Sequence, residues 1–228
     1  MAHIVSFTFN PFYENTYVIY DETGECVVID PGCYSKEEME ELGDFITRKQ
    51  LKPKYLINTH CHIDHVLGNK FVADTWRVPI MMHKGEIPVL HEVVNYAPTM
   101  GMYYKGSPEP EIFVDEGDIV TFGSTSLKVF FTPGHSPASV CFYNEADKFI
   151  VSGDVLFRRS IGRTDLPGGD YATLMQSIQE KLMVLPDDIK VYAGHMQPTT
   201  IGEERRENPF MNNKWPCFFE LSNKSSVF

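Results

Sequence analysis

Residues 59–65 concentrate side chains that bind metal ions. Four of the seven are potential ligands: His60, His62, Asp64 and His65. Residues 55–57, just before this segment, form an apolar run that is typical of a buried strand. Side chains alternate along an extended chain, so His60 and His62 are expected to share one metal ion. A helical pattern begins at Val66, which places Asp64 and His65 at a bend where both face a neighbouring second ion.

Three more polar residues follow predicted strands later in the chain: His135, Asp154 and His195. Each comes directly after a glycine, which permits the tight turn that would direct a loop towards a common point. One such residue alone is more often structural, but three in corresponding places favour a shared site. With the first four they supply the imidazoles and carboxylates that two divalent ions ~3.5–4 Å apart require. Zinc, iron or manganese suits these ligands, because no thiolate is needed.

The elements that must position these residues alternate between strands and helices. In the first half we predict strands at residues 4–9, 16–20, 26–29, 55–57 and 78–82, and helices at 36–50 and 66–76. In the second half we predict strands at residues 118–122, 125–131, 139–143, 149–151 and 190–193, and a helix at 171–185. Every candidate ligand in the second half then lies at the carboxyl end of a strand. Cys61 has the opposite parity to His60 and His62, so we expect it to face the protein interior.

The composition predicts a folded, acidic, single-domain protein that spans residues 1–228. Of its 228 residues, 43% are hydrophobic and 13% aromatic, which is ample for a core. The net charge of −11 argues against binding to nucleic acid or to an anionic membrane. The first residues lack a targeting pattern and nothing approaches the ~20 apolar residues of a membrane span, so we expect a cytoplasmic protein. Five cysteines without a C-x-x-C pair argue against a disulfide framework.

Two segments resist interpretation from the sequence. Residues 83–116 mix proline, glycine, tyrosine and methionine, and we predict an insertion or lid over the site, with packing against the domain as the alternative. His83 and His91 in this segment, and His3 near the start, have no ligand partner at a recognisable spacing, so we interpret them as surface or packed histidines. The aromatic tail, residues 209–228, is expected either to cover the core or to form a contact in a homodimer.

The pattern His60-x-His62-x-Asp64-His65, followed by His135, Asp154 and His195, resembles the metallo-β-lactamase superfamily of hydrolases. Residues 161–170 and 200–210 are similar to its compact glyoxalase II-like, or hydroxyacylglutathione hydrolase-like, branch. The resemblance implies an α/β (α+β) fold, a four-layer αβ/βα sandwich of two mixed sheets with outer helices. It assigns His60, His62 and His135 to the first ion, Asp64, His65 and His195 to the second, and Asp154 to both, with zinc as the expected metal.

The resemblance also implies a function, the hydrolysis of a small-molecule thioester such as S-lactoylglutathione. Two ions sharing a water would supply a hydroxide that attacks the carbonyl, with Asp64 accepting its proton. Other esters and lactones are variants of this hypothesis. Arg163 is the cation expected to hold a substrate carboxylate, with a surface ion pair as the alternative, whereas Arg158 and Arg159 are interpreted as surface ion pairs. Full-length glyoxalase II enzymes carry a further helical domain that grips glutathione, but only 33 residues follow His195 here.

Two rival functions remain open at the level of sequence. Persulfide dioxygenases share this fold, use a single iron, and have a run similar to Gly162-Arg163-Thr164-Asp165. A binding protein on an inactive hydrolase fold is the weaker rival, because the ligand set is complete.

Overall fold

The computed structural model describes residues 1–212 and contains two six-stranded sheets. The first sheet consists of β1 (His3–Phe9), β2 (Glu14–Tyr20), β3 (Glu25–Ile29), β4 (Lys52–Ile57), β5 (Ile80–Met82) and β6 (Ile112–Phe113), in that order. The second has the order β14 (Thr199–Thr200), β13 (Lys190–Ala193), β10 (Phe149–Gly153), β9 (Val140–Asn144), β8 (Thr125–Phe131) and β7 (Ile119–Phe122). A small hairpin joins β11 (Leu156–Phe157) to β12 (Ser160–Ile161).

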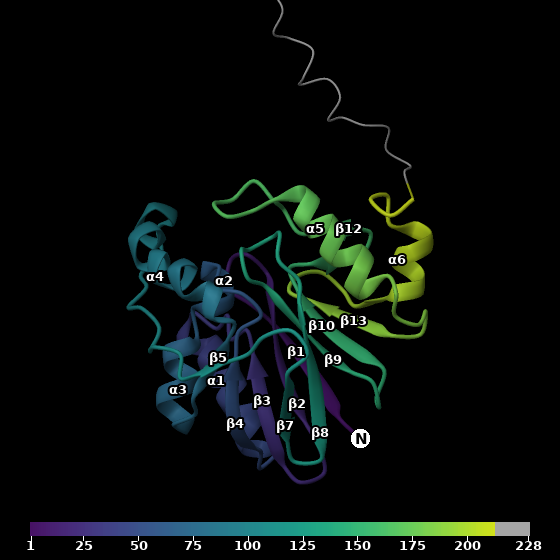
Figure 1. Cartoon of the computed structure of the whole chain (residues 1–228). Coiled ribbons are helices and arrows are strands. Elements are labelled where there is room, and N and C mark those ends of the chain that lie inside the picture. Colours follow the sequence, from purple (N-terminus) through teal and green to yellow (C-terminus); the bar gives the residue numbers. More distant parts are fainter. Residues whose placement is uncertain (213–228) are drawn as a thin grey trace, which may run out of the picture.

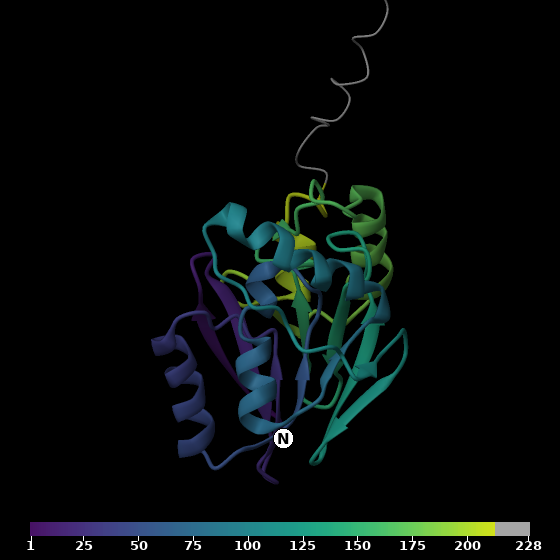
Figure 2. The ribbon, with the colours of Figure 1, turned by 90° about the vertical axis from the view of Figure 1, so that its left-hand side faces the viewer.

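The two sheets pack face to face and helices cover their outer faces (Figures 1 and 2). The helices are α1 (Lys36–Arg48), α2 (Ile63–Val66), α3 (Asn69–Trp76), α4 (Ile87–Tyr96), α5 (Tyr171–Ser177) and α6 (Ile201–Glu207). Two 3₁₀ helices, η1 (Lys84–Glu86) and η2 (Ala97–Met100), flank α4, and a π-helical turn, η3 (Ile178–Leu182), extends α5. This arrangement confirms the predicted four-layer sandwich of two mixed sheets with outer helices.

Both sheets are mixed, and parallel pairs lie where the site forms. In the first sheet β3, β4 and β5 are parallel, and in the second β10 and β13 are parallel. β5 and β6 are also parallel. All other neighbouring strands within the two sheets are antiparallel. The carboxyl ends of β4, β10 and β13 lie at the same edge of the sandwich, because residues that follow them, His65, Asp154 and His195, are close together.

Three apolar clusters form the core, one between each pair of layers. Side chains such as Ile29, Ile57 and Phe142 fill the space between the two sheets. Leu42 of α1 packs on the outer face of the first sheet, and Leu174 of α5 packs on the second. The core thus fixes both sheets and their helices, which leaves the edge loops to carry polar residues.

The predicted elements match the structure with a few differences. Of the helix predicted at residues 66–76, residues 69–76 form α3, and a separate one-turn helix, α2, ends at Val66. Between them Gly68 passes so close to Cys33 that a Cβ there would meet its sulfur. Ser35 caps α1 through a reciprocal capping box with Glu38. The strands β6, β11, β12 and β14 were not predicted, because two-residue strands carry no measurable periodicity. The seven-residue helix α6 was not predicted either.

The two uncertain segments have different outcomes. Residues 83–116 contain η1, α4 and η2, followed by an irregular stretch and β6 at the edge of the first sheet. Of the aromatic tail, Phe210 is described and is partly exposed, whereas residues 213–228 lie outside the described residues. In residues 1–212 no helix has both the length and the hydropathy needed to cross a membrane.

Candidate metal centre

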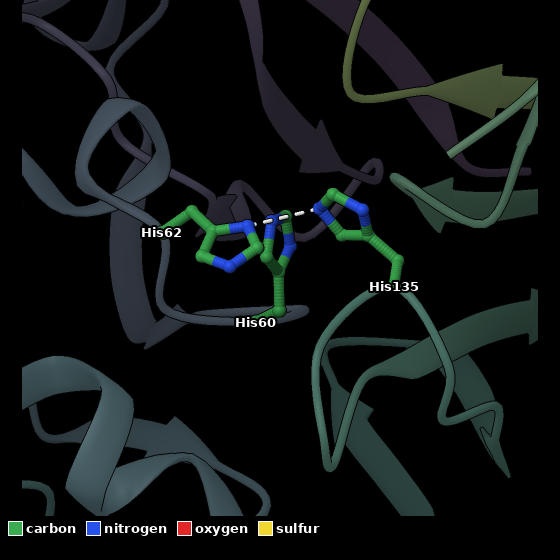
Figure 3. Close-up of side chains that lie close together, drawn as sticks. All are labelled: His60, His62 and His135. Atoms are coloured by element: carbon green, nitrogen blue, oxygen red, sulfur yellow. Dashed lines mark hydrogen bonds between the residues drawn. The ribbon is translucent and has the colours of Figure 1, made fainter. Parts of the chain in front are cut away.

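Three histidines converge from two loops at the edge of the sandwich (Figure 3). His60 and His62 follow β4, and His135 follows β8. The Nδ1 atom of His62 lies 2.9 Å from Nε2 of His135, and the His60 ring is centred 4.8 Å from that of His62 and 4.9 Å from that of His135. We call these three residues the histidine cluster. Three imidazole nitrogens on one point form a suitable set of ligands for a transition-metal ion.

A second group lies beside the first and contains a carboxylate. Asp64 and His65 lie on the one-turn helix α2, rather than on the bend that the sequence predicted, and His195 follows β13. Oδ2 of Asp64 lies 3.1 Å from Nε2 of His195 and 3.6 Å from Nε2 of His65. We call these residues the mixed cluster, because they combine two imidazoles with one carboxylate.

Asp154 lies between the two clusters. Its Oδ2 atom is 3.5 Å from Nε2 of His135 in the histidine cluster and 3.5 Å from Nε2 of His195 in the mixed cluster. Its Oδ1 atom is 3.4 Å from Nε2 of His65. The structure thus brings all seven predicted residues together, with one carboxylate within reach of both groups.

The far ring nitrogens of the histidines have their own partners. Nδ1 of His135 is 2.7 Å from the Arg163 carbonyl oxygen, and Nδ1 of His65 is 3.2 Å from Oδ2 of Asp30. Nδ1 of His195 is 3.3 Å from the Tyr13 carbonyl oxygen. Such partners fix the ring tautomer, so the Nε2 lone pairs of these histidines are directed into the site. Asp30 is itself held in place, because both of its oxygens accept hydrogen bonds from Thr59.

Buried polar atoms without hydrogen-bond partners show that the residues fit metal ions. Among the described residues, Nε2 of His60, Nε2 of His65 and Oδ1 of Asp154 are buried and have no such partner. A buried polar atom left unpaired costs about 1–3 kcal/mol, and folded proteins rarely retain several in one place. All three atoms face the centre of the site, where divalent cations would satisfy them.

The two clusters differ in the basicity of their imidazoles. Burial and the neighbouring His135 lower the pKa of His62 to about 4, and burial lowers the pKa of His60 well below its ordinary value. Burial also disfavours the charged form of His65, but Asp64 and Asp154 outweigh it and raise its pKa well above the usual range. The carboxylates likewise overcome burial at His195 and raise its pKa to about 9.

Sequence reasoning missed Glu86, a fully buried carboxylate that connects the two loops of the histidine cluster. Its Oε2 accepts a hydrogen bond from the backbone N–H of Cys61, at 2.9 Å. Its Oε1 accepts from the backbone N–H of Ala138, at 2.8 Å, and both oxygens accept from the Ser136 hydroxyl. Cys61 itself faces inward, with its sulfur 3.6 Å from that of Met82, as predicted from its parity.

A cavity of about 920 Å³ opens directly onto both clusters. His62, Asp64, His135, Asp154 and His195 line its floor. Its walls come from α4 and η2 on one side and from residues 157–167 on the other, together with Phe12 and Met196. The segment predicted as an insertion or lid therefore contributes one wall.

The remaining candidates lie outside the metal centre. Arg163 lines the cavity, but its guanidinium forms two hydrogen bonds of 2.7 Å with Asp165. Arg158 and Arg159 form ion pairs with Glu203 on the surface. His3, His83 and His91 stand apart: the ring of His3 stacks on Tyr20, and the other two face Asp115 and Glu109.

Comparison with known proteins identifies the family. Residues 9–195 match the model of the metallo-beta-lactamase superfamily. The hydroxyacylglutathione hydrolase GloC of Haemophilus influenzae is 36% identical over 209 residues, which are 89% of this chain and 95% of that protein. The crystal structure of the BLEG-1 B3 metallo-beta-lactamase has 35% identity and a TM-score of 0.85, and the match covers 92% of this chain and all of that one. TTHA1623 in a di-iron-bound form has 34% identity and a TM-score of 0.81, with coverage of 90% and 99%. The chain belongs to the metallo-β-lactamase superfamily.

Proposed function

We propose that the protein is a two-metal hydrolase that cleaves small-molecule thioesters. The observation that carries this proposal is the position of Asp154, whose carboxylate lies within 3.5 Å of imidazole nitrogens in both clusters. A single-metal site would leave the mixed cluster without a purpose. Zinc is the metal that we propose. The relative crystallised in a di-iron-bound form supports two ions and makes iron the first alternative, ahead of manganese.

When bound, two divalent ions lower the pKa of a water molecule towards neutrality and polarise the substrate carbonyl. The chain's own residues hold the site ready for that chemistry. His60, His62 and His135 would hold one ion, Asp64, His65 and His195 the other, and Asp154 both. The partners of the far ring nitrogens keep the histidines from rotating, so the ligand atoms need little reorganisation.

Asp64 is the residue to which we assign proton transfer. Its carboxylate forms part of the cavity floor and is partly exposed there, whereas His65 is fully buried. The Oδ2 atom faces Nε2 of His195, which leaves the carboxylate at the boundary between the mixed cluster and the cavity. Asp64 is therefore placed to accept a proton from a nucleophilic water.

The hydroxyl of Tyr96 on the cavity wall would give little help to a leaving group that must be protonated. Burial raises the pKa of Tyr96, a cavity-wall hydroxyl, to about 12, so it is a poor proton donor. A thiolate has a pKa near ~8.5 and departs without protonation, unlike an alkoxide or an amine. The relative from Haemophilus influenzae is named a hydroxyacylglutathione hydrolase, which also supports an acylated thiol as the substrate.

Elemental analysis combined with anaerobic assays tests the proposal. The purified protein, loaded with zinc or iron, is offered a panel of thioesters that includes S-lactoylglutathione, and thiol release is measured without oxygen. We expect two ions per chain and thiol release under these conditions. One iron per chain, with oxygen consumed on a persulfide and no anaerobic thiol release, would instead establish a dioxygenase.

A further inference from the structure

We propose that the thiol part of the substrate is apolar and carries no carboxylate, which distinguishes it from glutathione. This inference rests on the proposed thioester hydrolysis and specifies its substrate class. It follows from the chemistry of the cavity walls, which surround whatever part of the substrate extends beyond the metal centre.

Both walls present apolar side chains to the cavity. Val89, Tyr96 and Met100 contribute from α4 and η2, and Phe157, Ile161 and Leu166 face them from the other side. Met100 is about half exposed, and Tyr96 and Leu166 are partly exposed, so they have surface left to bury against a ligand. Each methylene of a ligand that these walls cover would raise kcat/KM by about fourfold.

The cavity offers little to an anionic ligand. Among its described lining residues Arg163 is the only arginine, and no lysine is present. Nε and Nη2 of Arg163 both donate to Asp165, so a ligand carboxylate would have to compete with this exposed ion pair. Glu92 on α4 adds a negative charge to the same wall, and within residues 1–212 its side chain has no ion-pair partner. Glutathione carries two carboxylates and one ammonium group, which this cavity would leave largely unpaired.

A matched pair of substrates isolates the effect of charge. S-lactoylglutathione and its dimethyl ester have the same acyl group and the same leaving sulfur, and they differ only in the two carboxylates. For the metal-loaded protein we expect kcat/KM to be at least about tenfold higher for the dimethyl ester, because unpaired carboxylates are costly in an apolar cavity. An equal or higher value for S-lactoylglutathione would overturn the inference and leave thioester hydrolysis standing.

Binding measurements separate this inference from the proposed reaction. S-benzylglutathione and its dimethyl ester are thioethers, which cannot be hydrolysed, and calorimetry reports their affinity directly. We expect the metal-loaded protein to bind the diester more tightly, by about tenfold. Tighter binding of the diester without turnover of any thioester would refute the proposed reaction alone. Tighter binding of the charged form would refute the inference.

Two substitutions locate the preference in the wall. Val89→Arg places a cation in the cavity and should shift the ratio of kcat/KM values towards S-lactoylglutathione. Glu92→Gln removes a partly solvated charge and should shift the ratio in the same direction by about two- to fivefold. The matched control is Glu111→Gln, an exposed carboxylate outside the cavity, which should leave the ratio unchanged. If Val89→Arg and Glu92→Gln shift the ratio no more than Glu111→Gln does, the cavity wall does not select the substrate.

Discussion

Two buried aspartates at opposite edges of the sandwich have different surroundings. Asp21 lies in the turn between β2 and β3, at the lower edge in Figure 1. Its carboxylate accepts hydrogen bonds from the backbone N–H and hydroxyl groups of Thr23 and Ser124 and from the Thr125 hydroxyl. At the opposite edge Asp154 faces imidazole nitrogens, and its Oδ1 atom has no hydrogen-bond partner.

The difference distinguishes a carboxylate whose hydrogen bonds are satisfied within the fold from one that has an oxygen without a partner. The donors around Asp21 come from the turns of both sheets, so this residue holds the sandwich together and needs nothing further. The neighbours of Asp154 are imidazole nitrogens, which present lone pairs whenever the histidines are neutral, and in that state a cation between them would satisfy both the nitrogens and the carboxylate. The same residue type thus stabilises the fold at one edge and is left unsatisfied at the other, where we propose that it binds metal.

The largest effect is expected from Asp154→Asn. An amide cannot supply a negative charge to both clusters, so we expect metal content to fall at both sites and kcat/KM to drop by more than about a thousandfold. Elemental analysis and thioester kinetics measure the two quantities, and circular dichroism checks the fold. The control is Asp21→Asn, which should keep both ions. Two ions and near-normal turnover in the Asp154 variant would show that the carboxylate is not shared.

A smaller loss, confined to one ion, is expected from His62→Ala. His62 belongs only to the histidine cluster, so the mixed cluster should keep its ion. We expect kcat/KM to fall by more than about a hundredfold, because loss of a metal ligand should cost more than loss of a residue that only hydrogen-bonds to a ligand, which costs at most about that much. Metal stoichiometry, read beside activity, distinguishes this variant from Asp154→Asn. His91→Ala removes an exposed histidine that binds Glu109 and serves as the matched control. Full turnover with two ions in the His62 variant would contradict its assignment.

The sequence predicted which residues would converge at the edge of the sandwich because their signal is local. His60, His62, Asp64 and His65 are adjacent in the chain, and His135, Asp154 and His195 each follow a glycine at a strand end. Strands of four or more residues were predicted for the same reason, since their alternation is visible over a short window. The packing of the two sheets, with β10 parallel to β13 in the second, then brings these strand ends to one edge, where Asp154 meets His65 and His195.

The surroundings of the site could not be predicted, because they depend on contacts between distant residues. Glu86 lies 50 residues from Ser136, its hydrogen-bond partner, and nothing in its own neighbourhood marks it as buried. The partners of His135 and His195 are backbone carbonyl oxygens, which every residue possesses. The sequence could not decide whether Arg163 binds a carboxylate or forms a surface ion pair, because a loop sequence does not show which way its side chains point. In the structure its guanidinium donates to Asp165, two residues away.

Glu86→Gln tests a carboxylate that shares a feature with each aspartate. Like Asp21, Glu86 has hydrogen bonds to both of its oxygens, and like Asp154, it belongs to the surroundings of the candidate metal centre. Gln has one acceptor oxygen and cannot accept from both Cys61 and Ala138, so the loops of the histidine cluster should shift. We expect kcat/KM to fall about ten- to a hundredfold, the range seen for outer-shell partners. The matched control is Glu204→Gln, a buried carboxylate that accepts from Arg159, Thr199 and Asn208, away from the clusters. It should lose stability but keep its turnover, and equal losses of turnover in both variants would argue against a specific role for Glu86.

The smallest effect on turnover, and the clearest on stability, is expected from Asp21→Asn. Hydrogen bonds to a charged group are stronger than neutral ones, so we expect the free energy of unfolding to fall by about 2–4 kcal/mol with kcat/KM unchanged. The hydrogen bonds from Thr23 and Ser124 outweigh burial and hold the pKa of Asp21 well below its ordinary value. Chemical denaturation of the metal-free protein measures the difference, with the exposed Glu41→Gln as a control expected within about 0.5 kcal/mol of the parent.

The pH dependence of this difference identifies the ionised carboxylate as its source. A carboxyl group whose pKa is lower in the folded state than in the unfolded state stabilises the fold fully above its unfolded pKa, about 3.9 for aspartate. As the pH falls below that value, the unfolded chain takes up the proton first, and the stabilisation is lost while the pH approaches the folded-state pKa. The gap between the parent and Asp21→Asn should therefore be constant from about pH 5 to 7 and should narrow below about pH 4. A gap that stays constant down to pH 3 would mean that Asp21 acts through its shape rather than its charge, and the contrast with Asp154 would then rest on geometry alone.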